Sequence, residues 1–268
     1  VAVLTVDSRV PHYARTAYTI EREFSRRGYE VILCNTGGDR AETLRYLQAV
    51  NQKQVDGIVL VGSVFDTICQ GTEMEKLLTG VPVVLANGKL DLPNAYSVTV
   101  DDKYGVSLAV EHLVARGRKN IYYIKDRDTD SAKSKRDGFL EAMRRNGLEF
   151  ADHVLEAGET LASGMETVQA LLAQGIVPDG IVCGEDLTAA GALKALLRAG
   201  LRVPGQVAVV GFNNSDYAHL CEPVLTSVDN KPEQVALLCV QLLESSIERS
   251  EAYSSVVLQP ELAQGETS

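Results

Sequence analysis

Residues 178–214 read "PDGIVCGEDLTAAGALKALLRAGLRVPGQVAVVGFNN" and contain a strand, a helix and a second strand in succession. "PDGIVCGED" is typical of a strand, residues 187–199 predict a helix, and "GQVAVVGF" predicts the next strand. Both strands are continuous apolar runs and do not alternate apolar with polar residues. This pattern is typical of a parallel sheet covered by helices on both faces, so the stretch predicts an α/β fold.

The same alternation of strand and helix extends over the whole chain. Runs such as "VAVLTV", "DGIVLVG" and "VPVVLAN" predict strands in the first part, and the pattern restarts at "SVTVDD". We therefore expect two doubly wound parallel-sheet lobes, an N-terminal lobe of residues 1–99 plus 229–257 and a C-terminal lobe of 101–227 plus 258–268. Three crossover strands would then join the lobes. Ligands of such sheets bind beyond the carboxyl ends of the strands, so we expect a ligand cleft between the lobes.

Two local features accompany this fold prediction. Ser131 is expected to cap a helix that ends near residue 145, and the last eight residues are expected to form a polar tail.

Composition excludes several classes of protein. The chain has 268 residues and a formal net charge of −10, so this stretch by itself is a poor binder of nucleic acid. The apolar runs are only strand-length, so we expect no membrane-spanning helix. Five scattered cysteines favour reduced thiols in a reducing compartment. The chain opens at Val1 inside a strand-like run and without a signal peptide, so we expect a trimmed chain.

Sequence signatures of catalysis are missing. The chain contains no G-x-G-x-x-G after a strand, no P-loop, no G-x-S-x-G elbow and no H-E-x-x-H. Its four histidines are isolated from one another, which makes a catalytic zinc site improbable. We therefore expect no cofactor, no metal and no enzymatic activity, and the polar residues that follow the strands point to recognition of a ligand.

Seven motifs in register carry a resemblance to a known family. They are "VDSRVPHYA", "QVDGIVLVGS", "GVPVVLANG", "VTVDDKYGVSLAVEHLVARGRKNIYYI", "SAKSKRDGFLEAM", the opening stretch "PDGIVCGED…VVGFNN", and "PVLTSVDNKPEQVALLCVQLL". Over essentially its full length the chain resembles the effector-binding core of LacI/GalR-type transcriptional regulators, which has a periplasmic-binding-protein-like fold. The spacing "AGLRVP-x-x-V-x-VVGF" favours the repressors over their periplasmic relatives.

The resemblance implies two Rossmann-like lobes, a small effector such as a sugar, and a homodimer. It also implies a cytoplasmic protein. Such a protein contacts operator DNA only through an N-terminal helix-turn-helix with a hinge helix, and we expect that domain to lie outside this chain. In such regulators effector binding reorients the lobes and thereby the paired DNA-binding heads. The alternative reading is a periplasmic sugar-binding protein of an ABC-type transporter.

Three candidate ligand-binding residues follow strands of the N-terminal lobe. Asp7 can accept hydrogen bonds from two hydroxyls, and Tyr13 offers an apolar ring with a polar tip. Asn87 ends "VPVVLAN", where the family often has an acid. The competing interpretations are loop amides satisfied by Asp7, a core role for Tyr13, and a turn role for Asn87. Arg9 and Val10 replace small polar residues of the family, so this rim is altered.

Five candidates belong to the C-terminal lobe: Lys135, Glu159, Glu185, Asp186 and Asn213. Lys135 stands where the family has a gripping arginine, and it offers a point charge in place of a planar fork. Glu159 and Glu185 are acidic departures from a family aromatic residue and a family asparagine. Asn213 replaces a family aspartate, which removes a charge and adds donors.

Two of these candidates, Lys135 and Asp186, also have a purely structural interpretation. Lys133, Lys135 and Arg136 together could be a solvated helix face, and Asp186 could be a helix N-cap. The excess of carboxylates predicts a neutral or cationic, hydroxyl-rich ligand and disfavours a sugar phosphate.

Overall fold

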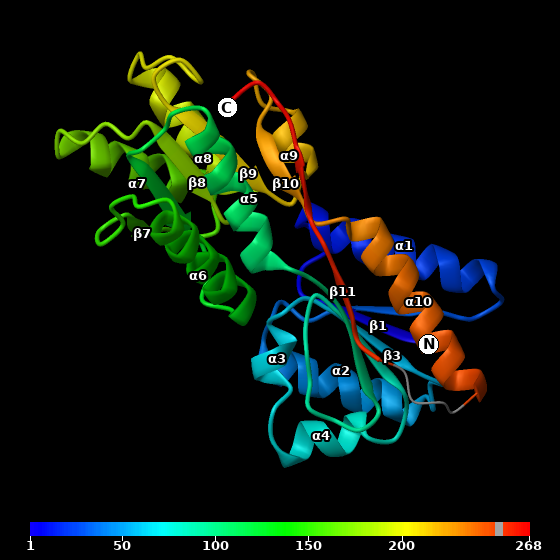
Figure 1. The fold of residues 1–268 in the computed structure, drawn as a ribbon. Coiled ribbons are helices and arrows are strands. Elements are labelled where there is room, and N and C mark those ends of the chain that lie inside the picture. The colour runs from blue at the N-terminus through cyan, green and yellow to red at the C-terminus, as the bar shows by residue number, and fades with distance from the viewer. Residues whose placement is uncertain (250–253) are drawn as a thin grey trace. The chain divides into compact units, whose positions relative to one another are not determined.

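The computed structural model describes residues 1–249 and 254–268 and divides the chain into two compact units. Unit 1 is Val1–Val100 with Lys231–Leu258, and unit 2 is Asp101–Asn230 with Gln259–Ser268. The chain therefore passes from one unit to the other three times. Each unit contains a six-stranded sheet with helices, and the predicted α/β fold class is confirmed (Figure 1).

Unit 1 has the strand order β11-β5-β4-β3-β1-β2, and all neighbouring strands are parallel. Every residue of β1, β3 and β4 is buried, as their unbroken apolar runs predict. The strands are β1 (Ala2–Thr5), β2 (Ile32–Asn35), β3 (Ile58–Val61), β4 (Val83–Ala86), β5 (Ala95–Val100) and β11 (Val256–Leu258). The helices are α1 (Pro11–Arg26), α2 (Arg40–Gln52), α3 (Phe65–Ile68), α4 (Thr72–Leu78) and α10 (Pro232–Arg249).

Unit 2 repeats this plan with the order β12-β10-β9-β8-β6-β7. Its first five strands along the chain are parallel, and β12 pairs antiparallel with β10. The strands are β6 (Ile121–Lys125), β7 (Val154–Glu156), β8 (Gly180–Cys183), β9 (Ala208–Phe212), β10 (Thr226–Asp229) and β12 (Glu261–Ala263). The helices are α5 (Asp102–Ala115), α6 (Asp130–Arg145), α7 (Leu161–Ala173), α8 (Asp186–Arg198) and α9 (Asp216–His219).

The two faces of the unit 2 sheet have separate apolar cores. Val182 and Val210 pack in one core with residues of α5 and α6, such as Phe139. Ile181 and Val209, their neighbours along the same strands, pack in the other core with residues of α7 and α8. Because successive strand residues point to opposite faces, a strand without polar positions supplies both cores.

The C-terminus differs from the predicted polar tail. Residues 261–263 form β12, and Thr267 is fully buried. The Thr267 hydroxyl donates to the Val209 carbonyl at 2.7 Å and accepts from the Thr226 amide at 2.9 Å. The prediction was wrong because these polar side chains satisfy backbone groups of β9 and β10, so their polarity does not indicate exposure.

Two helix starts also differ from the sequence prediction. Helix α6 begins after Thr129, whose side chain accepts from the Ala132 amide, and Ser131 instead donates to Asp102 at 2.6 Å. Helix α8 is capped by Glu185, whose carboxylate accepts from the Leu187 amide at 2.7 Å. Asp186 is the first helical residue, so it is not the cap.

Candidate ligand-binding site

Each sheet has one point where the strand order reverses along the chain. In unit 1 this switch point lies between β1 and β3, and in unit 2 it lies between β6 and β8. Ligands of open α/β sheets bind outside the carboxyl ends of the strands at such points. Asp7 lies just beyond β1, and Glu185 lies just beyond β8.

In unit 1 each predicted residue contacts groups of that unit. The Asp7 carboxylate accepts from the Arg9 amide at 2.9 Å and pairs with the exposed Arg9 guanidinium at 2.8 Å. Tyr13 is buried against Gly62, where an added Cβ would lie 2.9 Å from the Tyr13 ring. Asn87 is half-buried with a φ of 56°, and its amide donates to the Val98 carbonyl at 2.8 Å. The Asp7 carboxylate is therefore engaged by Arg9 at the end of β1.

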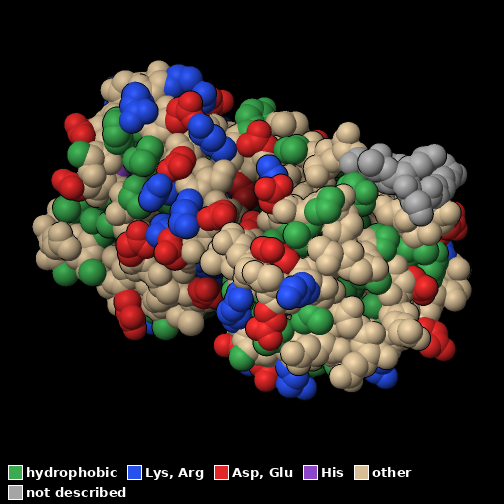
Figure 2. All heavy atoms as spheres, turned by 90° about the horizontal axis from the view of Figure 1, so that it is seen from below, with side chains coloured by type: hydrophobic (Ala, Val, Ile, Leu, Met, Phe, Trp, Pro, Cys, Tyr) green, Lys and Arg blue, Asp and Glu red, His purple; other side chains and the backbone are tan. Residues whose placement is uncertain are grey.

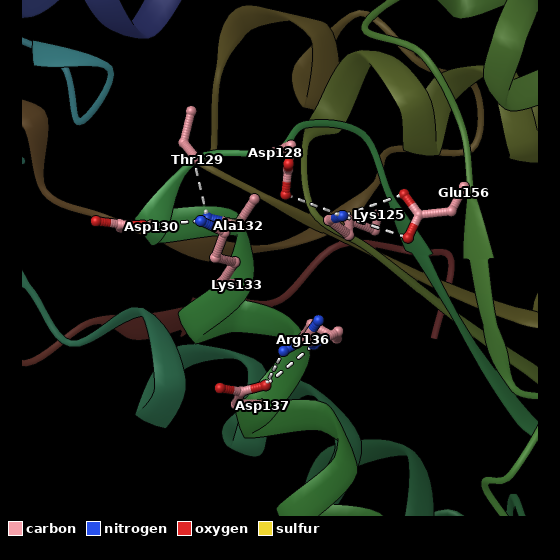
Figure 3. A network of polar contacts seen from close by, with 9 residues as sticks. All are labelled: Lys125, Asp128, Thr129, Asp130, Ala132, Lys133, Arg136, Asp137 and Glu156. Atoms are coloured by element: carbon pink, nitrogen blue, oxygen red, sulfur yellow. Dashed lines mark hydrogen bonds and ion pairs between the residues drawn. The ribbon is translucent and has the colours of Figure 1, made fainter. Parts of the chain in front are cut away.

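In unit 2, Lys135 points into the protein while its basic neighbours on α6 do not. Lys133 pairs with Asp130 at 3.1 Å and Arg136 with Asp137 at 2.7 Å, both on the outer side of α6 (Figure 3). The buried Lys135 ammonium instead donates to the Gly184 carbonyl at 3.0 Å and lies 3.8 Å from the centre of the Phe212 ring. The interpretation of all three as a solvated face was therefore wrong for Lys135.

The Lys135 ammonium lies near two carboxylates, those of the half-buried Asp102 and the fully buried Asp186. Burial raises the pKa of Asp102 and raises that of Asp186 to about 6, and the nearby ammonium lowers both. The Lys135 side chain is further fixed by its hydrogen bond to the Gly184 carbonyl and by its position over the Phe212 ring. Lys135 is therefore a charge-balancing residue of the floor beneath the site.

Asp186 joins three strand ends. One of its oxygens accepts from the Ser215 amide at 2.7 Å and the Ser215 hydroxyl at 2.8 Å, and the other accepts from the Ser227 hydroxyl at 2.6 Å. Because Asp186 is fully buried, these donors are what permit a carboxylate there. Gly211 is required beside it, since an added Cβ would lie 2.3 Å from the Asp186 carboxylate.

A buried, hydrogen-bonded row of side chains lies next to Asp186, which we call the anchor. The row consists of Glu185, Asn213 and Asn230. The Asn213 amide nitrogen donates to Glu185 at 3.2 Å, and the Asn230 amide nitrogen donates to the Asn213 oxygen at 2.7 Å. Asn213 has a φ of 99°, in the left-handed region that asparagine tolerates better than most residues. The backbone thereby brings its side chain into the row.

Glu159 lies apart from that row. It is exposed, and its carboxylate pairs with Arg127 at 3.2 Å, which in turn lies 3.4 Å from the carboxylate of the buried Asp126. Next to them, Lys125 at the end of β6 pairs with Glu156 at 3.2 Å and Asp128 at 3.5 Å (Figure 3). The cations at this edge are thus engaged by carboxylates.

Sequence reasoning missed two residues of this edge, Asp126 and Asn230. Each directly follows a strand, as Asp7 does, so the rule that found Asp7 could have found them. The structure brings Lys135, Glu185, Asp186 and Asn213 together, and it leaves Glu159 on the surface.

Other kinds of site find no support in the described residues. Within residues 1–249 and 254–268, no group of three or more His, Cys, Asp or Glu side chains is arranged to hold a metal ion. No helix in that part of the chain is long and apolar enough to span a membrane. On the face shown in Figure 2, Lys and Arg side chains are interspersed with Asp and Glu.

Comparison with known proteins places this geometry in a class. The family profile described as a periplasmic binding protein-like domain matches residues 110–268. A transcriptional regulator of the helix-turn-helix type from Lachnoclostridium phytofermentans is 30% identical over 91% of this chain and 74% of its own length. The ribose operon repressor of Escherichia coli is 28% identical over 91% and 74%. The solved complex of the regulator CelR with cellobiose has a TM-score of 0.84 at 25% identity and covers 100% of this chain and 84% of its own.

Fold and profile together define a periplasmic-binding-protein-like domain of two α/β units. The chain belongs to the LacI family of transcriptional regulators and constitutes their effector-binding core. The relatives are regulators of transcription and not enzymes.

The first prediction concerns Glu185, whose pKa is raised to about 7 by burial and by the Asp186 charge. The pKa of Glu185 is higher in the folded state than in the unfolded state, where it is near 4.5. Its contribution to the free energy of unfolding is therefore fully present below pH 4.5 and is lost as the pH rises to about 7. Glu185→Gln should therefore be more stable than the parent at pH 8 by up to about 3 kcal/mol, with the difference vanishing towards pH 4.5. Urea unfolding across this pH range measures it.

The exposed Glu166→Gln serves as the matched control and should show no such trend. A stability difference between Glu185→Gln and the parent that does not change with pH would contradict the assignment.

Proposed function

We propose that this chain is the effector-binding and dimerisation core of a transcriptional regulator that binds a small hydroxyl-rich ligand, a sugar or sugar derivative. Ligand binding then controls the attachment of a helix-turn-helix domain to operator DNA. The observation that carries the proposal is the buried row of Glu185, Asn213 and Asn230 at the carboxyl ends of three adjacent strands, next to a switch point. Ligand-orienting polar groups of this kind distinguish binding sites in α/β sheets.

The charges near the row favour a neutral or cationic ligand. Asp126 and Glu185 are carboxylates, and the nearby Lys135 ammonium is bound to the Gly184 carbonyl. A phosphate placed there would meet carboxylates, and the nearby Arg127 and Lys135 cations already have partners. Sugar hydroxyls, by contrast, can donate to carboxylate and amide oxygens. The names of two relatives, a ribose operon repressor and a regulator bound to cellobiose, support a sugar.

We place the action of the protein in the cytoplasm, where operator DNA is found. The five cysteines are free thiols, and four of them are buried, which suits a reducing compartment.

The second prediction tests ligand class and site together. In a thermal-shift screen of neutral sugars, amino sugars, sugar phosphates and nucleobases, a neutral or amino sugar should stabilise the protein. Ligand at 100 times its dissociation constant adds about 2.7 kcal/mol. Asn213→Ala should lose this shift, because it removes a polar group at the edge of the unit 2 sheet.

Asn146→Ala, at the exposed end of α6, is the control and should respond like the parent. A sugar phosphate that stabilises the protein while its free sugar does not would refute the ligand class. An unchanged response of Asn213→Ala would refute the site.

We further propose that the chain forms a homodimer through an apolar hollow of about 450 Å³ on unit 2. The hollow is lined by Leu161, Leu193, Leu197, Leu220 and Cys221 among others, and Leu220 is 81% exposed. Exposed leucine beside an apolar hollow is typical of protein–protein contacts. A two-fold dimer also suits a regulator that reads paired DNA half-sites.

The third prediction is that Leu220→Asp converts the dimer to a monomer, because the two-fold axis brings two new carboxylates into an apolar contact. Sedimentation equilibrium measures the mass. Val177→Asp, which changes an exposed valine of the same unit outside the hollow, should remain dimeric. A monomeric parent, or a dimeric Leu220→Asp variant, would contradict the proposed interface.

A further inference from the structure

A group of cations lies at the amino ends of the unit 2 strands, at the end of the sheet opposite the candidate ligand site. Arg118 and Lys119 precede β6, and Arg202 precedes β9; both strands pair with β8. Arg118 donates to the carbonyl of Pro204 and, at 3.3 Å, to that of Gln206. These bonds tie the loop before β6 to the loop that contains Arg202. We call Arg118, Lys119 and Arg202 the basic corner.

Arg118 carries a charge that no carboxylate of the described residues balances. The residue is half-buried, and its two terminal nitrogens donate to backbone carbonyls. Its Nε atom is buried and has no hydrogen-bond partner within residues 1–249 and 254–268. Charges that are removed from water are normally paired with an opposite charge. The Arg118 guanidinium is therefore a place where an anion from another molecule would complete the pairing.

Lys119 and Arg202 add two exposed cations beside Arg118. Neither forms an ion pair with a carboxylate in the part of the chain that the structure describes, whereas exposed cations on neighbouring helices do, such as Arg145 of α6 with Glu111 of α5. The nearby Asp179 carboxylate accepts from the backbone amides of Lys119 and of the next residue, both at 2.9 Å. Its oxygens are thus used within the loops, and the corner keeps an excess of positive charge.

An apolar surface adjoins the basic corner. Val177 precedes β8, the strand between β6 and β9, and is 52% exposed. Its carbonyl accepts from the Asn120 side-chain amide at 3.1 Å, which joins it to the loop of Arg118. Arginine beside apolar side chains is typical of protein–protein contacts, whereas contacts to nucleic acid go mainly to phosphates. The net charge of −10 also repels a polyanion at long range, and it repels a short segment with a few carboxylates much less.

We propose that the basic corner is a docking surface for an acidic segment of a partner protein, in which carboxylates flank an apolar side chain. The carboxylates pair with the three cations through charge-assisted hydrogen bonds, and the apolar side chain packs on Val177. The surface shares no residue with the candidate ligand site or with the lining of the hollow around Leu220. The inference therefore does not depend on the class of effector or on the dimer.

The test uses a fluorescently labelled peptide in which two leucines are flanked by glutamates, and a matched peptide with glutamines in place of the glutamates. Fluorescence anisotropy at about 50 mM salt should show that the parent binds the glutamate peptide about tenfold more tightly. This preference should fall as the salt rises to about 500 mM, because salt screens exposed charges. Equal affinities for the two peptides, or no binding of either, would overturn the proposal.

A double variant tests the place of binding. Lys119→Gln combined with Arg202→Gln should bind the glutamate peptide about tenfold more weakly, because two exposed charges are lost while Arg118 keeps its bonds to the fold. The matched control combines Lys53→Gln with Lys76→Gln, two exposed lysines of unit 1, and should stay within about twofold of the parent. An equal loss in the control, or unchanged binding by the double variant of the corner, would contradict the assignment.

A short duplex DNA without operator sequence separates the two classes of anionic partner. The parent should bind it more weakly than the glutamate peptide at the same salt concentration, because the net negative charge of the chain repels it. Tighter binding of the DNA, lost in the double variant of the corner, would assign the surface to nucleic acid and overturn the proposal.

Discussion

The fully buried carboxylate of Asp186 holds together the carboxyl ends of β9 and β10 and the start of α8. Its oxygens accept from Ser215 and Ser227, and the Ser227 hydroxyl accepts in turn from the Asn214 amide at 2.9 Å. Removing this carboxylate would leave buried donors unsatisfied, each at a cost of about 1–3 kcal/mol. The positions of Glu185 and Asn213, which adjoin these residues in sequence, depend on that anchor.

The anchor explains why an apolar strand such as β9 ends in several polar residues. Phe212 packs in the core and its ring contacts the Lys135 ammonium. Asn213 enters the hydrogen-bonded row with Glu185, and Ser215 donates to Asp186. Lys135 balances the negative charge beneath, so it does not supply a free cation at the surface of the site. Different structural roles are thus divided among adjacent residues of one turn.

The fold could be predicted because burial on both faces of a parallel sheet leaves a direct mark on the sequence. The runs "IVLV" of β3 and "AVVGF" of β9 have no other economical explanation. The C-terminal strand β12 has no such apolar run, because its three residues pair with a single neighbouring strand. The buried Thr267 beyond it bonds to backbone groups of β9 and β10 and is polar itself. Likewise, a helical pattern could not show which of Lys133, Lys135 and Arg136 points inward, since that depends on Gly184 and Phe212, distant in sequence. Asn230 directly follows β10, so the search for polar residues at strand ends could have selected it, but it was not predicted.

Hydrogen–deuterium exchange, followed by mass spectrometry with and without a saturating sugar that stabilises the protein, tests most directly whether the unit 2 sheet edge receives the effector. We expect slowed exchange in peptides that contain residues 184–187, 211–215 and 226–230. Binding that protects only peptides of α8 and α9 around Leu197 and Leu220, with these three segments unchanged, would contradict it.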